Sequence, residues 1–257
     1  METTTTTIIC KNCEVNFQGN FCSNCGQSAH THSINWHYVW HEIEHGIFHV
    51  DKGLFYTIKE LFTSPGKTIR HFIAGKRSQY FKPAAMVFLL ASIYGFLYHY
   101  FDINIKMPTF GASSDAVKVQ DSIYEWMIGH FALVTLLTIP LYAIGSFLAF
   151  KKSGYNFVEH LVLNSFLAGQ KLVVQLALLP VVVYYNSTGV LSILMTALYL
   201  IDIALTGWTY GKFFNKFKWS SRILRTVLAY TILMTTYIVG GIIIGIISTV
   251  IKLWIGK

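Results

Sequence analysis

Cysteine is absent from this chain after residue 25, and charge is scarce along its whole length. Only 12% of the 257 residues are charged, whereas 53% are hydrophobic, which is too apolar for an ordinary soluble domain. The N-terminal region also lacks a basic and then apolar leader, so we expect it to stay in the compartment where it is made. The composition therefore indicates a membrane protein.

Five apolar windows each have about the ~20 residues that are needed to cross a hydrocarbon core of ~30 Å. They lie at about 83–101, 127–150, 161–185, 190–211 and 226–251, and the first 80 residues hold no comparable window. The connection 102–126 is expected to be a long loop. We therefore predict an all-α membrane protein, with about five transmembrane helices in a bundle at 83–257.

Lysine and arginine are distributed unevenly between the two sides of these windows. Fifteen of the 20 lie before the first window or in the second and fourth connections, four lie on the opposite side, and Lys171 lies inside a window. Because basic residues accumulate on the cytoplasmic side, we expect a cytoplasmic N terminus and an external C terminus. The net charge of +8 is then mainly a signal of topology, and nucleic acid is not expected as a partner.

The four cysteines form two C-x-x-C pairs in the segment CKNCEVNFQGNFCSNCGQ, residues 10–27, and they are Cys10, Cys13, Cys22 and Cys25. Each C-x-x-C turn brings two sulfurs to one side of a metal, and four thiolates suit a tetrahedral Zn²⁺ ion. Disulfides are the alternative, but they need an oxidising compartment. The expected cytoplasmic location favours a small ribbon with a structural zinc ion.

Residues 1–9 are expected to be a flexible tail, and residues 28–82 a cytoplasmic linker with amphipathic helices near 34–50 and 54–62. A short helix follows, with Ser64 as its cap, Pro65 in its first turn and Gly75 as its end. Anionic lipid headgroups or a partner could bind the cations of this segment, although orientation alone would also explain them. These cations are Lys67, Arg70, Lys76, Arg77 and Lys82.

A histidine-rich face on the first of these helices could form a second metal site or a pH-sensitive site. Its residues are His37, His41, Glu44, His45 and His49, and they include the metalloprotease pattern H-x-x-E-H. A catalytic site needs a third protein ligand, and only Glu159 and His160 are candidates on the same side of the membrane. Four histidines at this spacing also fit a solvated helix face.

Four polar residues lie inside the apolar windows, where lipid makes polar groups costly: Gln170, Lys171, Gln175 and Asp202. The depths of Lys171 and Asp202 in neighbouring windows allow an ion pair. Such a pair could fix the register of two helices, or it could line a polar cavity for an ion, a proton or a lipid headgroup.

Residues 10–83 contain FCSNCGQ, HVDKG and LFTSPGKTIRHFIAGKRSQYFKP, and the last of these includes PG-x-x-I-R-x-x-x-x-GKR. With these motifs the segment resembles an uncharacterised family of bacterial multi-pass membrane proteins, catalogued as a domain of unknown function with an N-terminal zinc ribbon. The resemblance implies an inner-membrane location and a structural metal, and no reaction.

These observations favour a non-enzymatic integral inner-membrane protein, an accessory or docking subunit whose ribbon and basic juxtamembrane helix bind a partner or lipid headgroups. Membrane lipids and another protein or membrane complex are the expected partners. The alternatives are a transporter or channel for a small solute, ion or lipid, and a membrane metallohydrolase at His41, Glu44 and His45.

Overall fold

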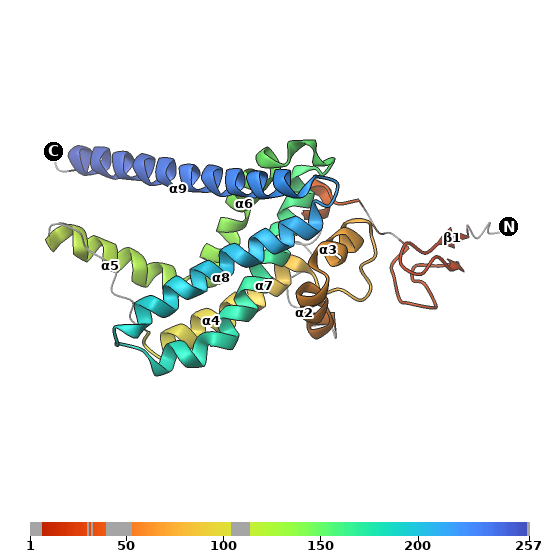
Figure 1. Cartoon of the computed structure of the whole chain (residues 1–257), viewed down its shortest axis with the longest axis horizontal. Coiled ribbons are helices and arrows are strands. Elements are labelled where there is room, and N and C mark those ends of the chain that lie inside the picture. Colours follow the sequence, from red (N-terminus) through yellow and green to blue (C-terminus); the bar gives the residue numbers. More distant parts are fainter. Residues whose placement is uncertain (1–6, 30, 32, 40–52, 104–113, 256–257) are drawn as a thin grey trace.

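Five long apolar helices dominate the computed structural model of the chain, which describes residues 7–29, 31, 33–39, 53–103 and 114–255 (Figure 1). The helices able to cross a membrane are α4 (Pro83–Tyr100), α6 (Phe131–Ala149), α7 (Phe157–Tyr184), α8 (Val190–Phe213) and α9 (Trp219–Ile255). The predicted all-α class with five spans is confirmed, and the chain is a multi-pass membrane protein.

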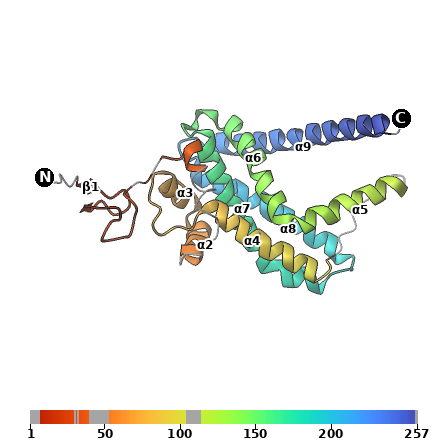
Figure 2. The ribbon, with the colours of Figure 1, turned by 180° about the vertical axis from the view of Figure 1, so that it is seen from behind.

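The cysteine segment and the C terminus lie at opposite ends of the molecule (Figures 1 and 2). The short helices α2 (Gly53–Thr63) and α3 (Pro65–Ile73) lie between the cysteine segment and the five long helices. We call this end of the bundle the ribbon end. It also holds the 3₁₀ turn η1 (Lys151–Ser153), which connects α6 to α7, and the turn between α8 and α9.

Several element bounds differ from the sequence expectation. The connection 102–126 contains the helix α5 (Ser114–Gly129), so much of it is not a loop, and α6 starts at Phe131. Helix α9 starts at Trp219, seven residues before the expected window at 226. Its first turns carry Arg222 and Arg225, and these charges kept the turns out of the apolar window. Hydropathy windows exclude such charged turns even when the backbone is helical.

Helix starts follow from ordinary capping chemistry. Pro65 and Pro83 occupy the first turns of α3 and α4, where a missing N–H costs no hydrogen bond. Asn156 and Glu159 form a reciprocal capping box at the start of α7. Glu159 is therefore part of a helix cap.

Helix α7 lies at the centre of the bundle and packs against α4, α6 and α8. Helices α2 and α3 belong to the same core, because Leu61, Ile69 and Phe72 are buried and the ring of Phe72 meets that of Phe166 edge to face, with centroids 5.1 Å apart. The helical turn 36–39 also approaches α7, since Asn156 Nδ2 donates to the carbonyl of Ile34 at 2.9 Å. Residues 34–39 and the helices α2 and α3 thus pack against the ribbon end of the bundle.

Candidate metal centre and juxtamembrane joint

The cysteine segment folds as two similar turns joined to a short hairpin. Strand β1 (Ile8–Ile9) pairs antiparallel with β2 (Asn16–Phe17). In the first turn the N–H of Glu14 donates to the carbonyl of Cys10 at 2.9 Å, and in the second the N–H of Gly26 donates to the carbonyl of Cys22 at 2.8 Å. Equivalent backbone turns therefore present both cysteine pairs.

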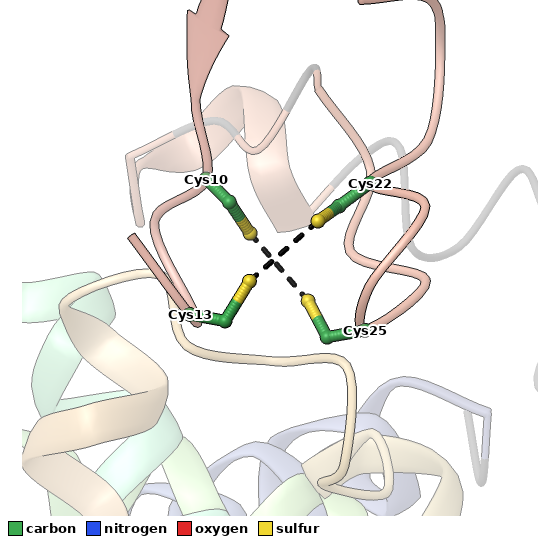
Figure 3. A group of neighbouring side chains, drawn as sticks. All are labelled: Cys10, Cys13, Cys22 and Cys25. Atoms are coloured by element: carbon green, nitrogen blue, oxygen red, sulfur yellow. Dashed lines mark hydrogen bonds between the residues drawn. The ribbon is translucent and has the colours of Figure 1, made fainter. Parts of the chain in front are cut away.

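The four cysteine sulfurs face a common centre (Figure 3). Cys10 Sγ lies 3.5 Å from Cys25 Sγ, and Cys13 Sγ lies 3.6 Å from Cys22 Sγ. All four atoms lie within 4.8 Å of one another, and all four thiols are free. Tetrahedral zinc with Zn–S bonds of about 2.3 Å separates its sulfurs by about 3.8 Å, whereas a disulfide needs about 2.05 Å. This cluster can hold a metal ion.

The two thiols of the first turn differ in acidity. A hydrogen bond from the side chain of Asn24 lowers the pKa of Cys13 to about 6, whereas burial raises the pKa of Cys10 to about 11. Metal ligands must be thiolates, so the binding of a cation must displace the proton of Cys10.

The ribbon is attached to the turn between α3 and α4 by the side chain of Gln27. Its Oε1 accepts the backbone N–H groups of Arg77 at 3.0 Å and Ser78 at 2.9 Å, and its Nε2 donates to Thr31 Oγ1 at 2.6 Å. Gln27 is only 5% exposed. Asn12 Nδ2 adds a bond to Ser78 Oγ at 2.8 Å. We call α3 and the following residues 74–82 the juxtamembrane joint.

Gly75 is a second point where the joint and the ribbon approach closely. Its φ of +97° ends α3 in the left-handed conformation that favours glycine, and an added Cβ would lie 3.1 Å from Cδ of Lys11. Lys11 is itself held, because its Nζ donates to the carbonyl of Thr31 at 2.7 Å. Gly75, which the sequence analysis assigned to the end of the helix, therefore also leaves room for the side chain of Lys11 in the ribbon.

Among the five cations proposed for lipid or partner binding, Arg70, Lys76 and Arg77 make contacts within the chain that can be described in detail. Arg77 Nε donates to the carbonyl of Phe72 at 3.1 Å, and its guanidinium lies 4.8 Å from the ring centroid of Tyr38. Arg70 Nη1 donates to the carbonyls of Lys212 at 2.7 Å and Phe213 at 3.0 Å. Lys76 lies 3.9 Å from a carboxylate oxygen of Glu14, Lys67 is exposed, and Lys82 precedes α4 as its N-cap residue.

Two further arginines resemble Arg70 in capping the ends of helices. Arg222 donates to the carbonyl of Gly211 near the end of α8, and Arg225 Nη1 donates to that of Ala149 at the end of α6. A cation there satisfies otherwise unpaired carbonyls and interacts favourably with the helix dipole. Sequence reasoning counted these residues only toward topology. The signal it missed is the choice of arginine, whose forked donor suits such contacts.

The intramembrane polar residues divide into two groups. Gln170 is completely buried and structural, since its Nε2 donates to the carbonyl of Leu61 at 3.2 Å and its Oε1 accepts from Thr209 Oγ1 at 2.9 Å. Lys171 Nζ lies 3.9 Å from Asp202 Oδ2, so the proposed pair between α7 and α8 forms. Gln175 and Lys171 line a cavity between α6 and α7.

A buried network near the ribbon end was not predicted. Ser146 Oγ lies 2.9 Å from His160 Nδ1 and accepts from Asn164 Nδ2 at 3.0 Å, while Tyr210 OH donates to Asn164 Oδ1 at 2.6 Å. The network joins α6, α7 and α8. It engages Nδ1 of His160, the histidine that the sequence analysis considered as a third metal ligand. Residues 160 and 164 are four positions apart, and a helix places such residues on one face. This spacing is the signal from which the sequence could have indicated the network.

The histidine-rich face falls mostly outside the described part of the chain. His37 is described and exposed. His41, Glu44, His45 and His49 lie outside the described residues, so the metallohydrolase and pH-site hypotheses stay predictions.

Comparison with known proteins gives one family match. A family model described as a protein of unknown function (DUF3667) matches residues 51–95. No curated protein and no solved structure matches the chain. The matched segment spans α2, α3 and most of α4. The chain is thus similar to that family over the juxtamembrane joint, which the ribbon holds on one side and α8 on the other.

Proposed function

We propose that this protein is a non-enzymatic accessory subunit of the bacterial inner membrane, in which a zinc ribbon binds a protein partner on the cytoplasmic side. The observation that carries the proposal is that the ribbon is attached to the joint on one side and exposes apolar side chains elsewhere. One side is attached to the joint through Gln27 and Asn12. Elsewhere the ribbon exposes apolar side chains, with Ile9 and Phe21 each 67% exposed and Val15 42% exposed.

The chemistry of the cysteine cluster supports zinc as its ion. All four donors are sulfur, the separations fit a tetrahedral ion, and soft thiolate sets of this kind favour zinc over calcium or magnesium. The ion would stabilise the ribbon fold, because a segment this small has little core of its own: Cys10, Phe17 and Cys22 are its buried hydrophobic residues in the described range.

Charge placement supports a cytoplasmic ribbon and an external C terminus. The ribbon end carries exposed lysines on η1, on the last turn of α8 and on the turn between α8 and α9, namely Lys151, Lys152, Lys212, Lys216 and Lys218. Such residues accumulate on the cytoplasmic side and attract anionic lipids there. Free thiols also fit a reducing compartment.

A protein partner fits the ribbon better than nucleic acid does. Nucleic acids are held by cations that reach phosphates, and in residues 7–29 Lys11 is the one cation. Its Nζ donates to the carbonyl of Thr31. Exposed apolar residues such as Ile9 and Phe21 instead suit burial in a protein interface.

The double variant Ile9→Ser, Phe21→Ser tests this proposal. Crosslinking in intact cells and mass spectrometry of the crosslinked complex should show a defined partner for the wild type, with at least a tenfold loss in the variant at unchanged zinc content. Tyr184→Ser is the matched control, because it removes an aromatic side chain that is 79% exposed far along the chain. Equal crosslinking in both variants would refute docking through the ribbon.

A further inference from the structure

A cavity of about 120 Å³ lies between α6 and α7, in the interior of the spans. Its polar lining comes from Thr135, Thr138 and Tyr142 on α6 and from Asn164, Lys171 and Gln175 on α7. The rest of its lining is apolar, and it includes Leu167 and Leu172. A polar cavity of this kind is costly in a membrane-spanning bundle unless its groups find partners.

Lys171 is the charged residue of this lining, and it is 8% exposed. Its Nζ lies 3.9 Å from Asp202 Oδ2 and 4.9 Å from the ring centroid of Tyr142. The first distance balances the charge of the ammonium but exceeds the 2.7–2.9 Å of a direct charged hydrogen bond. Within the described residues this ammonium makes no hydrogen bond, so its N–H groups are left for an acceptor in the cavity.

Two more donor groups of the lining share this condition. In the described part of the protein, neither the hydroxyl of Tyr142 nor the amide of Gln175 makes a hydrogen bond. The other lining groups are already engaged. Thr135 and Thr138 donate to helix carbonyls, and Asn164 donates to Ser146 and His160. The cavity therefore combines unsatisfied donors on Tyr142, Lys171 and Gln175 with threonine oxygens whose protons are already donated.

The charge that a ligand of this cavity can carry follows from Asp202 and Lys171. This carboxylate already neutralises Lys171, and a second anion in the cavity would be repelled by it in a medium of low dielectric. A cation would be repelled by Lys171. An uncharged hydrogen-bond acceptor would satisfy the donors without either penalty.

The position of the cavity indicates where such a ligand comes from. Phe131, Thr135, Thr138 and Tyr142 are half-buried, so the α6 side of the cavity is not sealed by protein. Thr138 lies seven residues from the start of α6, which is about 10 Å along a helix. A molecule dissolved in the bilayer can reach this depth with its apolar chain still in lipid.

We propose that the cavity binds the uncharged carbonyl group of a membrane-soluble amphiphile, with Tyr142, Lys171 and Gln175 as hydrogen-bond donors. Asp202 holds the charge balance and keeps anions out. The apolar part of the lining contacts the carbon skeleton next to the carbonyl. This site is independent of partner binding by the ribbon.

Three photoreactive probes with the same ten-carbon chain and diazirine, ending in a methyl ketone, a carboxylate or a methyl group, test the proposal on the full-length protein in nanodiscs. Mass spectrometry locates the adducts. The ketone probe should label residues 131–142 and 164–175 at least fivefold more than the methyl-ended probe does, and an unlabelled ketone should compete.

The variants Gln175→Leu and Tyr142→Phe should each reduce ketone labelling severalfold, because each removes one donor and leaves the pair of Lys171 and Asp202 intact. Tyr184→Phe is the control for loss of a phenolic hydroxyl. Three outcomes would overturn the proposal: equal labelling by the methyl-ended probe, stronger labelling by the carboxylate probe, or ketone labelling that is the same in both cavity variants and the wild type.

Discussion

At the scale of single residues, arginines and lysines make different contacts at the ribbon end. Arg70, Arg222 and Arg225 donate to carbonyls at the ends of α6 and α8, whereas lysines such as Lys67 and Lys212 are exposed. A planar guanidinium suits fixed carbonyls, and a hydrated ammonium suits water or headgroups. Sequence counting registers both only as positive charge, so it grouped Arg70 and Arg77 with the lysines as candidates for lipid or partner binding.

The variant Arg70→Met should destabilise the protein by about 1–3 kcal/mol, because the carbonyls of Lys212 and Phe213 lose a charged donor. The measurement is thermal unfolding in nanodiscs, made once with neutral and once with anionic lipids. The loss should be the same in both lipids, since Arg70 acts within the chain. Lys67→Met, an exposed cation on the same helix, is the control and should leave stability within about 0.5 kcal/mol of the wild type. A destabilisation by Arg70→Met that appears only with anionic lipids would restore the headgroup role.

At the scale of elements, sequence signals located helices well where local chemistry determines them. Pro65 and Gly75 bound the short helix as expected, and the apolar windows located five spans. The same reasoning missed α5, whose mixed sequence has no continuous apolar run, and it missed the charged first turns of α9. It could not show that α3 packs on α8, because that contact depends on residues about 140 positions apart.

Gly66 is the residue that permits this contact, and Gly66→Ala tests it. An added Cβ would collide with the backbone of Lys212 and Phe213, so α3 must move away from α8. We expect a loss of about 1–3 kcal/mol, as is usual for overpacking, measured by thermal unfolding and by faster proteolysis after Arg70. Gly207→Ala on α8 is the matched control, because its Cβ would meet nothing within 4 Å. Ordinary helix propensity makes that change neutral or stabilising by up to about 1 kcal/mol. If Gly66→Ala is tolerated as well as the control, α3 and α8 do not depend on close backbone packing.

At the scale of the whole molecule, the ribbon and the bundle have separate cores that meet at the joint. The ribbon core consists of Cys10, Phe17 and Cys22, whereas the bundle core includes Phe72 and Phe166. The sequence predicted the ribbon from cysteine spacing alone, because the spacing is local. It gave no sign of the attachment between Gln27 and residues 77 and 78, which lie about 50 positions away. The ribbon is therefore held against the joint just before the first span.

This arrangement predicts that loss of the metal weakens the backbone protection of the joint and leaves that of the bundle unchanged. Without its ion the ribbon should unfold, so Gln27 would no longer accept the backbone N–H groups of Arg77 and Ser78. Hydrogen exchange after chelation, or in Cys22→Ser, Cys25→Ser, should then accelerate at least tenfold at these two amides. Amides of α7 should be unchanged, because their helix lies in the separate core.

The variant Gln27→Leu separates the metal from the attachment. It should accelerate the same two amides while the metal stays bound and the N–H of Cys22, which donates to the backbone carbonyl of residue 27, stays protected. Gln79→Leu, an exposed glutamine on the same turn, is the control and should change neither. Since chelation and Gln27→Leu remove the same acceptor of these two amides, combining them should add nothing further there. Continued protection of Arg77 and Ser78 after complete metal removal would show that the joint keeps its shape without the ribbon, and the coupling would then be absent.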